Sequence, residues 1–244
     1  PFLSQALRNH PIVLRDALYK GFDKTFEEQL LAASNTRIWR GSKAEVMSGL
    51  RTAKRGIALT IAMADIAGVW SLEKVCEGLS RFAEVSISIA LNFLLHQVGQ
   101  SGHFTLKHAE NPGRDSGVTI LGMGKLGARE LNYSSDIDLL ILFDGEKIEY
   151  VGEDGPQQGL HRLVRELVSI LGERTADGYV FRTDMRLRPD PGATPLAVST
   201  AAAEHYYESL GQNWERAAMI KARPVAGDLK VGEQFLERLV PFVW

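Results

Sequence analysis

Two aspartates at the start of an apolar run are the residues whose type and spacing most favour chemistry. Asp136 and Asp138 are separated by one residue and lead into the apolar run 139–143. Because this run is short and aliphatic, it predicts a strand buried on both faces, in which alternate side chains point the same way. The two carboxylates are therefore predicted to project side by side, where they repel each other and lose hydration. A divalent cation beside them would relieve both effects, and oxygen-only ligands favour Mg²⁺ or Mn²⁺.

A glycine-rich turn lies just before the two aspartates. After the apolar run 118–121, the glycines Gly122, Gly124 and Gly127 spell G-x-G-x-x-G. Glycine allows the backbone to approach a phosphate closely, so the turn is a candidate phosphate-binding element. Two other interpretations stay open. The glycines and aspartates could simply build a tight, capped turn, or the pattern could belong to a dinucleotide-binding fold.

The dinucleotide-binding interpretation is the weaker alternative. Asp144 does end the next predicted strand about 20 residues further on, as such a fold requires. The intervening segment 128–135 is too short for a crossover helix with its loop, and several of its residues favour a turn. That interpretation also leaves Asp136 and Asp138 without a role, and it predicts binding of a nicotinamide or flavin cofactor.

A third carboxylate is predicted on a later strand. Residues 179–187 read as a strand, and here apolar side chains alternate with a charged set made of Arg182, Asp184, Arg186 and Arg188. Such a face is unfavourable to bury unless it meets charged ligands, and guanidinium groups suit phosphate oxygens. Asp184 would then complete a metal site with the two earlier aspartates. On the residues alone, a salt-bridge ladder on an exposed strand explains the pattern equally well.

Three sequence blocks together resemble one enzyme family. They are G-x-G-K-L-G-x-R-E-L-x-x-S-S-D-I-D-L at 122–139, the segment 180–189 and the segment 214–223. In this order they are similar to the glutamine synthetase adenylyltransferase/adenylyl-removing enzymes, which belong to the polymerase-β-like nucleotidyltransferase superfamily. The resemblance covers most of the chain and is firmest from Gly122 to Arg223.

The resemblance implies a site for metal-dependent nucleotidyl transfer. The carboxylates of Asp136, Asp138 and Asp184 would hold Mg²⁺ or Mn²⁺. The nucleotide- and phosphate-binding set would be Gly122, Gly124, Lys125, Ser135, Arg186 and Arg188. Superfamily members often have serine where this chain has Lys125, so this lysine is expected to contact phosphate as a cation. The two serines before Asp136 are expected to hold the turn rather than to act as nucleophiles.

Full-length members of this family resemble two related nucleotidyltransferase units in one chain. One unit transfers AMP from ATP to a tyrosine of glutamine synthetase, and the other removes it by phosphorolysis, in which phosphate attacks and ADP is released. The later two blocks are more similar to the N-terminal, removing unit, so we expect that activity. The implied partners are glutamine synthetase, a PII-type signalling protein, ATP or ADP, and phosphate. The alternatives are the ATP-dependent adding unit, a related uridylyltransferase, and a catalytically silent nucleotide-binding regulatory module.

Composition favours an ordinary soluble protein. The chain has 244 residues, of which 45% are hydrophobic and 24% charged, and its net charge of −2 predicts no nucleic-acid partner. The single cysteine, Cys76, fits a reducing compartment. With no secretory signal and no apolar run of the ~20 residues that a membrane span needs, we expect a cytoplasmic protein without a membrane partner. The first residue is Pro1 and the last apolar pattern stops at Trp244, so we expect a fragment of a longer protein.

The elements that must position the site predict an α+β fold. We expect a helical N-terminal region at 1–104, a nucleotidyltransferase core with a small mixed sheet at 105–198, and a truncated C-terminal helical segment at 199–244. Capping boxes at Thr25 and Ser42 predict helix starts.

Helical periodicity predicts several of these elements. Long helices are expected at 42–68 and 71–99, an amphipathic one at 159–173, and two more at about 200–210 and 212–222, the last stopped by Pro224. Arg51, Lys54 and Arg55 share one helical face, which is interpreted as solvated, with partner contact as the alternative.

Overall fold

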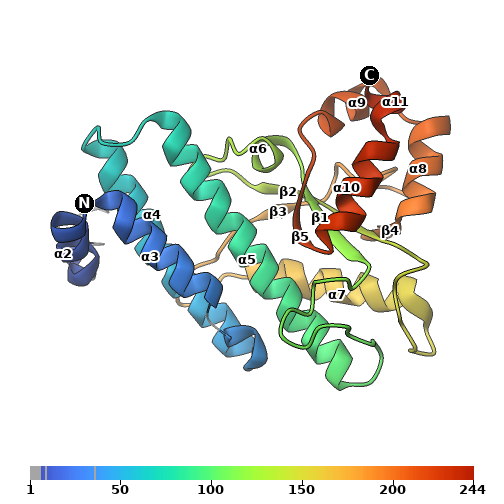
Figure 1. Ribbon diagram of the computed structural model, residues 1–244, viewed down its shortest axis with the longest axis horizontal. Coiled ribbons are helices and arrows are strands. Elements are labelled where there is room, and N and C mark those ends of the chain that lie inside the picture. The colour runs from blue at the N-terminus through green and yellow to red at the C-terminus, as the bar shows by residue number, and fades with distance from the viewer. Residues whose placement is uncertain (1–6, 9, 36) are drawn as a thin grey trace.

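The protein packs a helical region against one side of a small mixed sheet, as this computed structural model of residues 7–8, 10–35 and 37–244 shows (Figure 1). The early helices lie on one side of the molecule and the C-terminal helices on the other, with the sheet between them. This arrangement confirms the predicted α+β fold class.

Long helices build the N-terminal region. They are α2 (Pro11–Lys20), α3 (Phe22–Asn35), α4 (Lys43–Ile66) and α5 (Leu72–Gln100), with the short 3₁₀ helix η1 (Ile38–Arg40) before α4. The side chain of Ser42 accepts a hydrogen bond from the Glu45 amide and Glu45 returns one to the Ser42 amide, so the capping box predicted here is confirmed. Ser71 caps α5 by accepting from the Lys74 amide.

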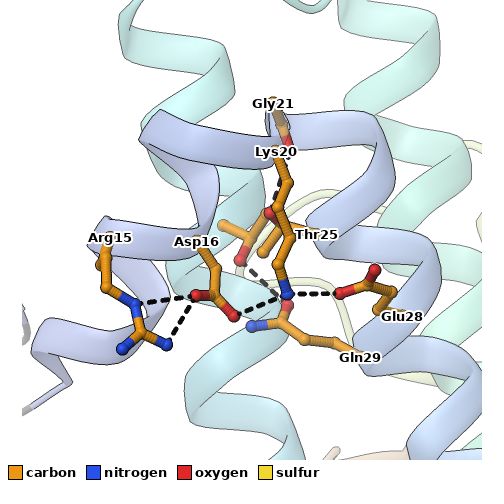
Figure 2. Close-up of polar contacts among 8 residues, drawn as sticks. Arg15, Asp16, Lys20, Gly21, Thr25, Glu28 and Gln29 are labelled. Carbon is orange, nitrogen blue, oxygen red and sulfur yellow. Dashed lines mark hydrogen bonds and ion pairs between the residues drawn. The ribbon is translucent and has the colours of Figure 1, made fainter.

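The capping box predicted at Thr25 is wrong. Thr25 lies inside α3, and its hydroxyl donates to the carbonyl of Gly21 at 2.9 Å. Gly21 has a φ of +83°, which lets the chain turn sharply from α2 into α3. Figure 2 shows that this corner is tied by ion pairs, in which the Lys20 ammonium reaches Asp16 at 3.1 Å and Glu28 at 2.8 Å.

The sheet has five strands: β1 (Val118–Gly122), β2 (Ile137–Phe143), β3 (Thr183–Asp184), β4 (Ala197–Ser199) and β5 (Arg223–Gly227). β1 pairs with β2 and with β5 in the antiparallel sense. β3 pairs in parallel with the first residues of β2, and β4 in parallel with its last residues. A dinucleotide-binding fold needs the first two strands to be parallel and joined by a crossover helix, so the β1–β2 pairing rules that alternative out.

The remaining helices are α6 (Gly124–Gly127), α7 (Gly155–Gly172), α8 (Thr200–Ser209), α9 (Asn213–Met219), α10 (Leu229–Arg238) and α11 (Val240–Val243). The amphipathic helix expected at 159–173 therefore starts earlier. The helix expected at 212–222 ends at Met219, and the chain then enters β5, which sequence reasoning missed. Pro224 is tolerated there because β5 lies at the edge of the sheet.

The strand predicted at 179–187 is mostly wrong, because only Thr183–Asp184 pair as a strand. After Asp184 the chain turns, and the Arg186 amide donates to the Asp184 carboxylate at 2.8 Å. A side-chain acceptor two residues back stabilises a turn rather than a continuing strand. The alternation of residues in this segment therefore does not place Arg188 on the same face as Asp184.

Apolar side chains fill both faces of the sheet. One core cluster joins the N-terminal helices, α7 and one face of β1 and β2, and includes Ile61, Leu91, Ile120, Leu139 and Leu167. A second cluster joins the other face to the C-terminal helices and includes Leu121, Leu140, Tyr207 and Phe235. The first core cluster contains residues on both sides of the predicted domain limit at residue 104. Strand β5 belongs to the sheet although it lies beyond the predicted limit at residue 198. The predicted domain limits stay predictions.

Helix α5 is long and apolar enough to cross a membrane by length and composition, yet 72% of its apolar window is buried inside the protein. Buried core helices pass the same test, so α5 is explained by its place against both the other helices and the sheet.

Candidate active site

The sheet brings two of the predicted carboxylates directly side by side. Asp138 of β2 and Asp184 of β3 are partners in the parallel register, so their side chains leave the same end of neighbouring strands. Asp136 immediately precedes β2. Gly124 completes the group, since a Cβ atom built on it would lie 2.8 Å from Oδ2 of Asp138. The glycine turn and the acidic strand ends therefore form one site.

Burial and like charge act together on the carboxyl of Asp138. Burial raises its pKa, and the neighbouring carboxylates of Asp184 and Asp136 raise it further, while Arg186 and Lys125 act in the opposite direction. This combination is typical of a site that awaits a positive ligand. Any cation placed here would favour the ionised form of Asp138.

Two arginines hold the other two carboxylates. The Arg182 guanidinium donates to Asp136 at 2.5 Å, and the Arg186 guanidinium contacts both oxygens of Asp184, with its closest hydrogen bond at 2.5 Å. The hydrogen bond from Arg186 lowers the pKa of Asp184. Across the described part of the chain, no three acidic, histidine or cysteine side chains gather closely enough to ligate one ion. In each ion pair the carboxylate lies against a guanidinium.

The predicted phosphate-binding glycines differ in what they contact. Gly122 is buried, and a Cβ there would meet side-chain atoms of Val225 and Leu126 at 2.8 and 2.9 Å, so its position serves close packing. Gly124 has a φ of +51° and lies against the acidic group. Lys125 is exposed and lies close enough to Asp138 to lower the pKa of that residue. The exposed ammonium of Lys125 is therefore placed where it can meet an anion.

Two further predicted residues have structural contacts. The Ser135 hydroxyl donates to the Asn132 side chain at 2.9 Å, which holds the turn before β2 as expected. The Arg188 guanidinium donates to the carbonyls of Met185, Pro191 and Thr194 at 2.6–3.4 Å. Arg188 therefore folds the loop after β3, and its predicted contact with phosphate stays a prediction.

Sequence reasoning missed that Arg223 holds the glycine turn through hydrogen bonds. Arg223 of β5 donates to the carbonyls of Leu126 and Gly127 at 3.3 and 3.2 Å and to Glu84 of α5 at 2.5 Å. Gly127 must be glycine here, because a Cβ would lie 1.9 Å from the carbonyl oxygen of Lys221. The block 214–223 singled out this segment, but only the missed strand β5 explains how Arg223 reaches the turn.

The interpretation of the basic face of α4 as solvated is wrong for Arg51 and Lys54, whereas Arg55 is exposed. Arg51 is only 1% exposed, and Lys54 reaches backbone carbonyls in the segment that leads to β3. The signal that could have revealed this lay in the periodicity, since Met47 and Arg51 lie one turn apart on a stripe that includes the core residue Leu50.

Comparison with known proteins shows the family to which the chain belongs. Residues 1–238 match the family model described as glutamate-ammonia ligase adenylyltransferase. The chain belongs to this family. The bifunctional glutamine synthetase adenylyltransferase/adenylyl-removing enzyme of Rhizobium meliloti (strain 1021) is 49% identical over 100% of the chain. The protein of the same name from Agrobacterium fabrum (strain C58 / ATCC 33970) is 52% identical over 82% of the chain. The one from Bartonella quintana (strain Toulouse) is 46% identical over 100% of the chain.

The chain spans about a quarter of the length of these relatives: 25% of the Rhizobium and Bartonella proteins and 20% of the Agrobacterium protein. Proteins of this adenylyltransferase family are enzymes, and adenylyl transfer is a nucleotidyl transfer. Paired carboxylates beside a glycine turn and an exposed lysine suit that class of reaction, because they provide ligands for a cation and a positive charge for a phosphate.

Proposed function

We propose that this chain is the adenylyl-removing unit of a glutamine synthetase adenylyltransferase/adenylyl-removing enzyme. The observation that supports a transferase site is the parallel register of Asp138 and Asp184 beside Gly124. Burial and the neighbouring carboxylates raise the pKa of Asp138, so its ionised form is unfavourable here unless a cation compensates it. The direction of the reaction rests on the sequence blocks 180–189 and 214–223, which resemble the N-terminal unit.

The donor set fits a divalent cation. Asp136, Asp138 and Asp184 offer carboxylate oxygens only, which Mg²⁺ and Mn²⁺ prefer. A cation bound there supplies electrostatic stabilisation of the charge on the transferred phosphoryl group. Arg182 and Arg186 hold two of these carboxylates, and each guanidinium can turn to phosphate oxygens when its carboxylate binds the ion.

The proposed reaction exchanges one phosphate ester for an anhydride. An oxygen of inorganic phosphate attacks the phosphorus of the adenylyl group, a new P–O bond forms, and the bond to the tyrosine oxygen breaks. The products are ADP and free tyrosine, which takes up a proton. Lys125, Arg182 and Arg186 are the cations that can bind and orient the attacking phosphate, and the absence of a side chain on Gly124 avoids a close contact with Asp138.

The test mixes this chain with adenylylated glutamine synthetase, Mg²⁺ and phosphate, and measures ADP. Phosphate-dependent ADP release is the expected result. Asp136→Asn combined with Asp138→Asn should abolish it, and circular dichroism controls for folding. Asp16→Asn is the control, because this carboxylate pairs with Arg15 and Lys20 of α2 and belongs to none of the predicted site residues.

Transfer of AMP from ATP to unmodified glutamine synthetase, without ADP release from the adenylylated form, would instead identify the adding unit. A PII-type partner is part of this proposal. It predicts that such a protein changes the rate of ADP release by the full-length enzyme.

A further inference from the structure

A buried arginine of α4 holds the backbone that leads to the acidic site. The Arg51 guanidinium donates to the carbonyls of Ile170 and Glu173 at the end of α7, at 3.2 and 2.5 Å, and to Gly178 at 2.8 Å. It also donates to Met47 of its own helix at 2.9 Å. A guanidinium suits this task because its planar donors point in several fixed directions at once.

One turn further along α4, Lys54 holds the next stretch of the same segment. Its ammonium donates to the carbonyls of Tyr179 and Val180 at 3.2 and 2.5 Å. It also lies over the aromatic rings of Tyr179 and Phe181, 4.6 and 5.3 Å from their centroids. Carbonyl oxygens and ring faces are both partners for a cation, so the lysine is bound on several sides.

This segment passes directly into the acidic strands. The amides of Val180 and Phe181 donate to the carbonyl of Leu171 at 2.9 and 3.0 Å. The amide of Ile137 then donates to the carbonyl of Arg182 at 2.9 Å, and the register that follows pairs Asp138 with Asp184. A shift of residues 178–182 would therefore move Asp184 relative to Asp138.

We propose that Arg51 and Lys54 are positioning residues for the reaction, which fix residues 178–182 and thereby hold Asp184 beside Asp138. Their hydrogen bonds in the described residues all go to backbone carbonyls, so they act through the chain and not on the substrate. The catalytic part of this inference rests on the proposed nucleotidyl transfer.

The charge of Lys54 bears on whether this residue stabilises the fold or only positions the segment 178–182. Burial lowers the pKa of Lys54 to about 8, and the nearby charges of Arg51 and Arg182 lower it further. A lysine whose pKa is lowered on folding makes the folded state less stable at neutral pH, where it is charged, than above its folded pKa. Replacing Lys54 relieves this cost but also removes its hydrogen bonds to two carbonyls, so the melting temperature is expected to change little.

The first test uses the metal-free chain alone. Hydrogen exchange of the amides of Val180, Phe181 and Ile137 is compared in the wild type, Lys54→Met and Lys54→Arg. Lys43→Met is the matched control, because Lys43 lies on the same helix and contacts Glu166 and Ser169 of α7. Faster exchange in Lys54→Met only, with recovery in Lys54→Arg, is expected. Equal exchange in Lys54→Met and Lys43→Met overturns the proposal.

The second test measures phosphorolysis. A misplacement of catalytic groups by about 1 Å can lower a rate on the order of 10²-fold. Lys54→Met should therefore lower kcat by this order, with little change in KM for adenylylated glutamine synthetase and little change in the melting temperature. Lys54→Arg should restore most of the rate.

An unchanged kcat in Lys54→Met, with an active wild type, overturns the positioning role and leaves the proposed function intact. A wild type without activity, whose amides still exchange faster in Lys54→Met, overturns the proposed function and leaves the hold on residues 178–182 intact.

Discussion

The acidic site and the basic face of α4 differ in how their charged side chains are compensated by neighbouring groups. At the site, burial and the negative charges of Asp184 and Asp136 raise the pKa of Asp138. On α4, the fully buried Arg51 finds acceptors for its donors in backbone carbonyls. A satisfied buried charge makes its surroundings rigid, whereas an unsatisfied one is kept for a ligand. The contrast assigns stability to one region and reactivity to the other.

Loss of the carboxylates is the change with the largest expected effect. Asp136→Asn with Asp138→Asn should lower the rate of nucleotidyl transfer by at least roughly 10³-fold, since metal-based stabilisation amounts to several kcal/mol. Steady-state kinetics measures the rate, and a Mn²⁺ titration should show lost binding. A double variant that keeps wild-type Mn²⁺ affinity would contradict the assignment of the site.

Loss of Arg51 should act on stability. Arg51→Met leaves three carbonyls outside α4 without this donor, at about 1 kcal/mol each. We expect the free energy of unfolding in urea to fall by roughly 2–4 kcal/mol. Arg51→Lys should lie between, because an ammonium cannot span the same acceptors. An unchanged unfolding midpoint would show that the carbonyls find other partners.

Neutralising Asp138 alone should stabilise the protein, whereas loss of Arg51 should destabilise it. Because the pKa of Asp138 is raised on folding, the folded state binds its proton more tightly, and stability falls as the pH rises through the window above 3.8. Asp138→Asn should therefore melt higher than the wild type at pH 7, by roughly 2–4 °C, since solvent screens this half-buried group. The difference should shrink as the pH falls toward 3.8. A lower melting temperature at pH 7 would contradict the crowding of the carboxylates.

The smallest effect is expected at the rim of the basic face. Arg55 and Asp177 form an exposed ion pair at 2.6 Å, and such pairs contribute about 0.2–1 kcal/mol. Arg55→Gln should change the free energy of unfolding by no more than this, and less at high salt. A loss as large as that of Arg51→Met would remove the distinction between buried and exposed members of the face.

Local signals predicted much of this fold. The box at Ser42 and the periodicity of α4 and α5 depend on neighbours within a few residues, so these helices were predictable. β2 was predictable because it is a short aliphatic run. The candidate pair Asp136 and Asp138 came from the same local pattern.

What failed depends on distant partners. Alternation suggested a strand at 179–187, but a side-chain bond between Arg186 and Asp184 ends it. β5 was missed because Pro224 resembles a helix stop, and its pairing with β1 is non-local. Arg51 was interpreted as solvated although it lies beside the apolar stripe of α4, because its acceptors at the end of α7 are distant in the sequence.

The hydrogen bonds between Arg223 of β5 and the glycine turn have a consequence for folding during synthesis. During synthesis the three carboxylates have all emerged by residue 184, whereas Arg223 and β5 follow later. Until then β1, which is apolar and fully buried in the finished protein, has an open edge. Such an edge is prone to pair with other chains. A chain that stalls or is cut between α8 and β5 would therefore carry all three carboxylates and still be inclined to aggregate.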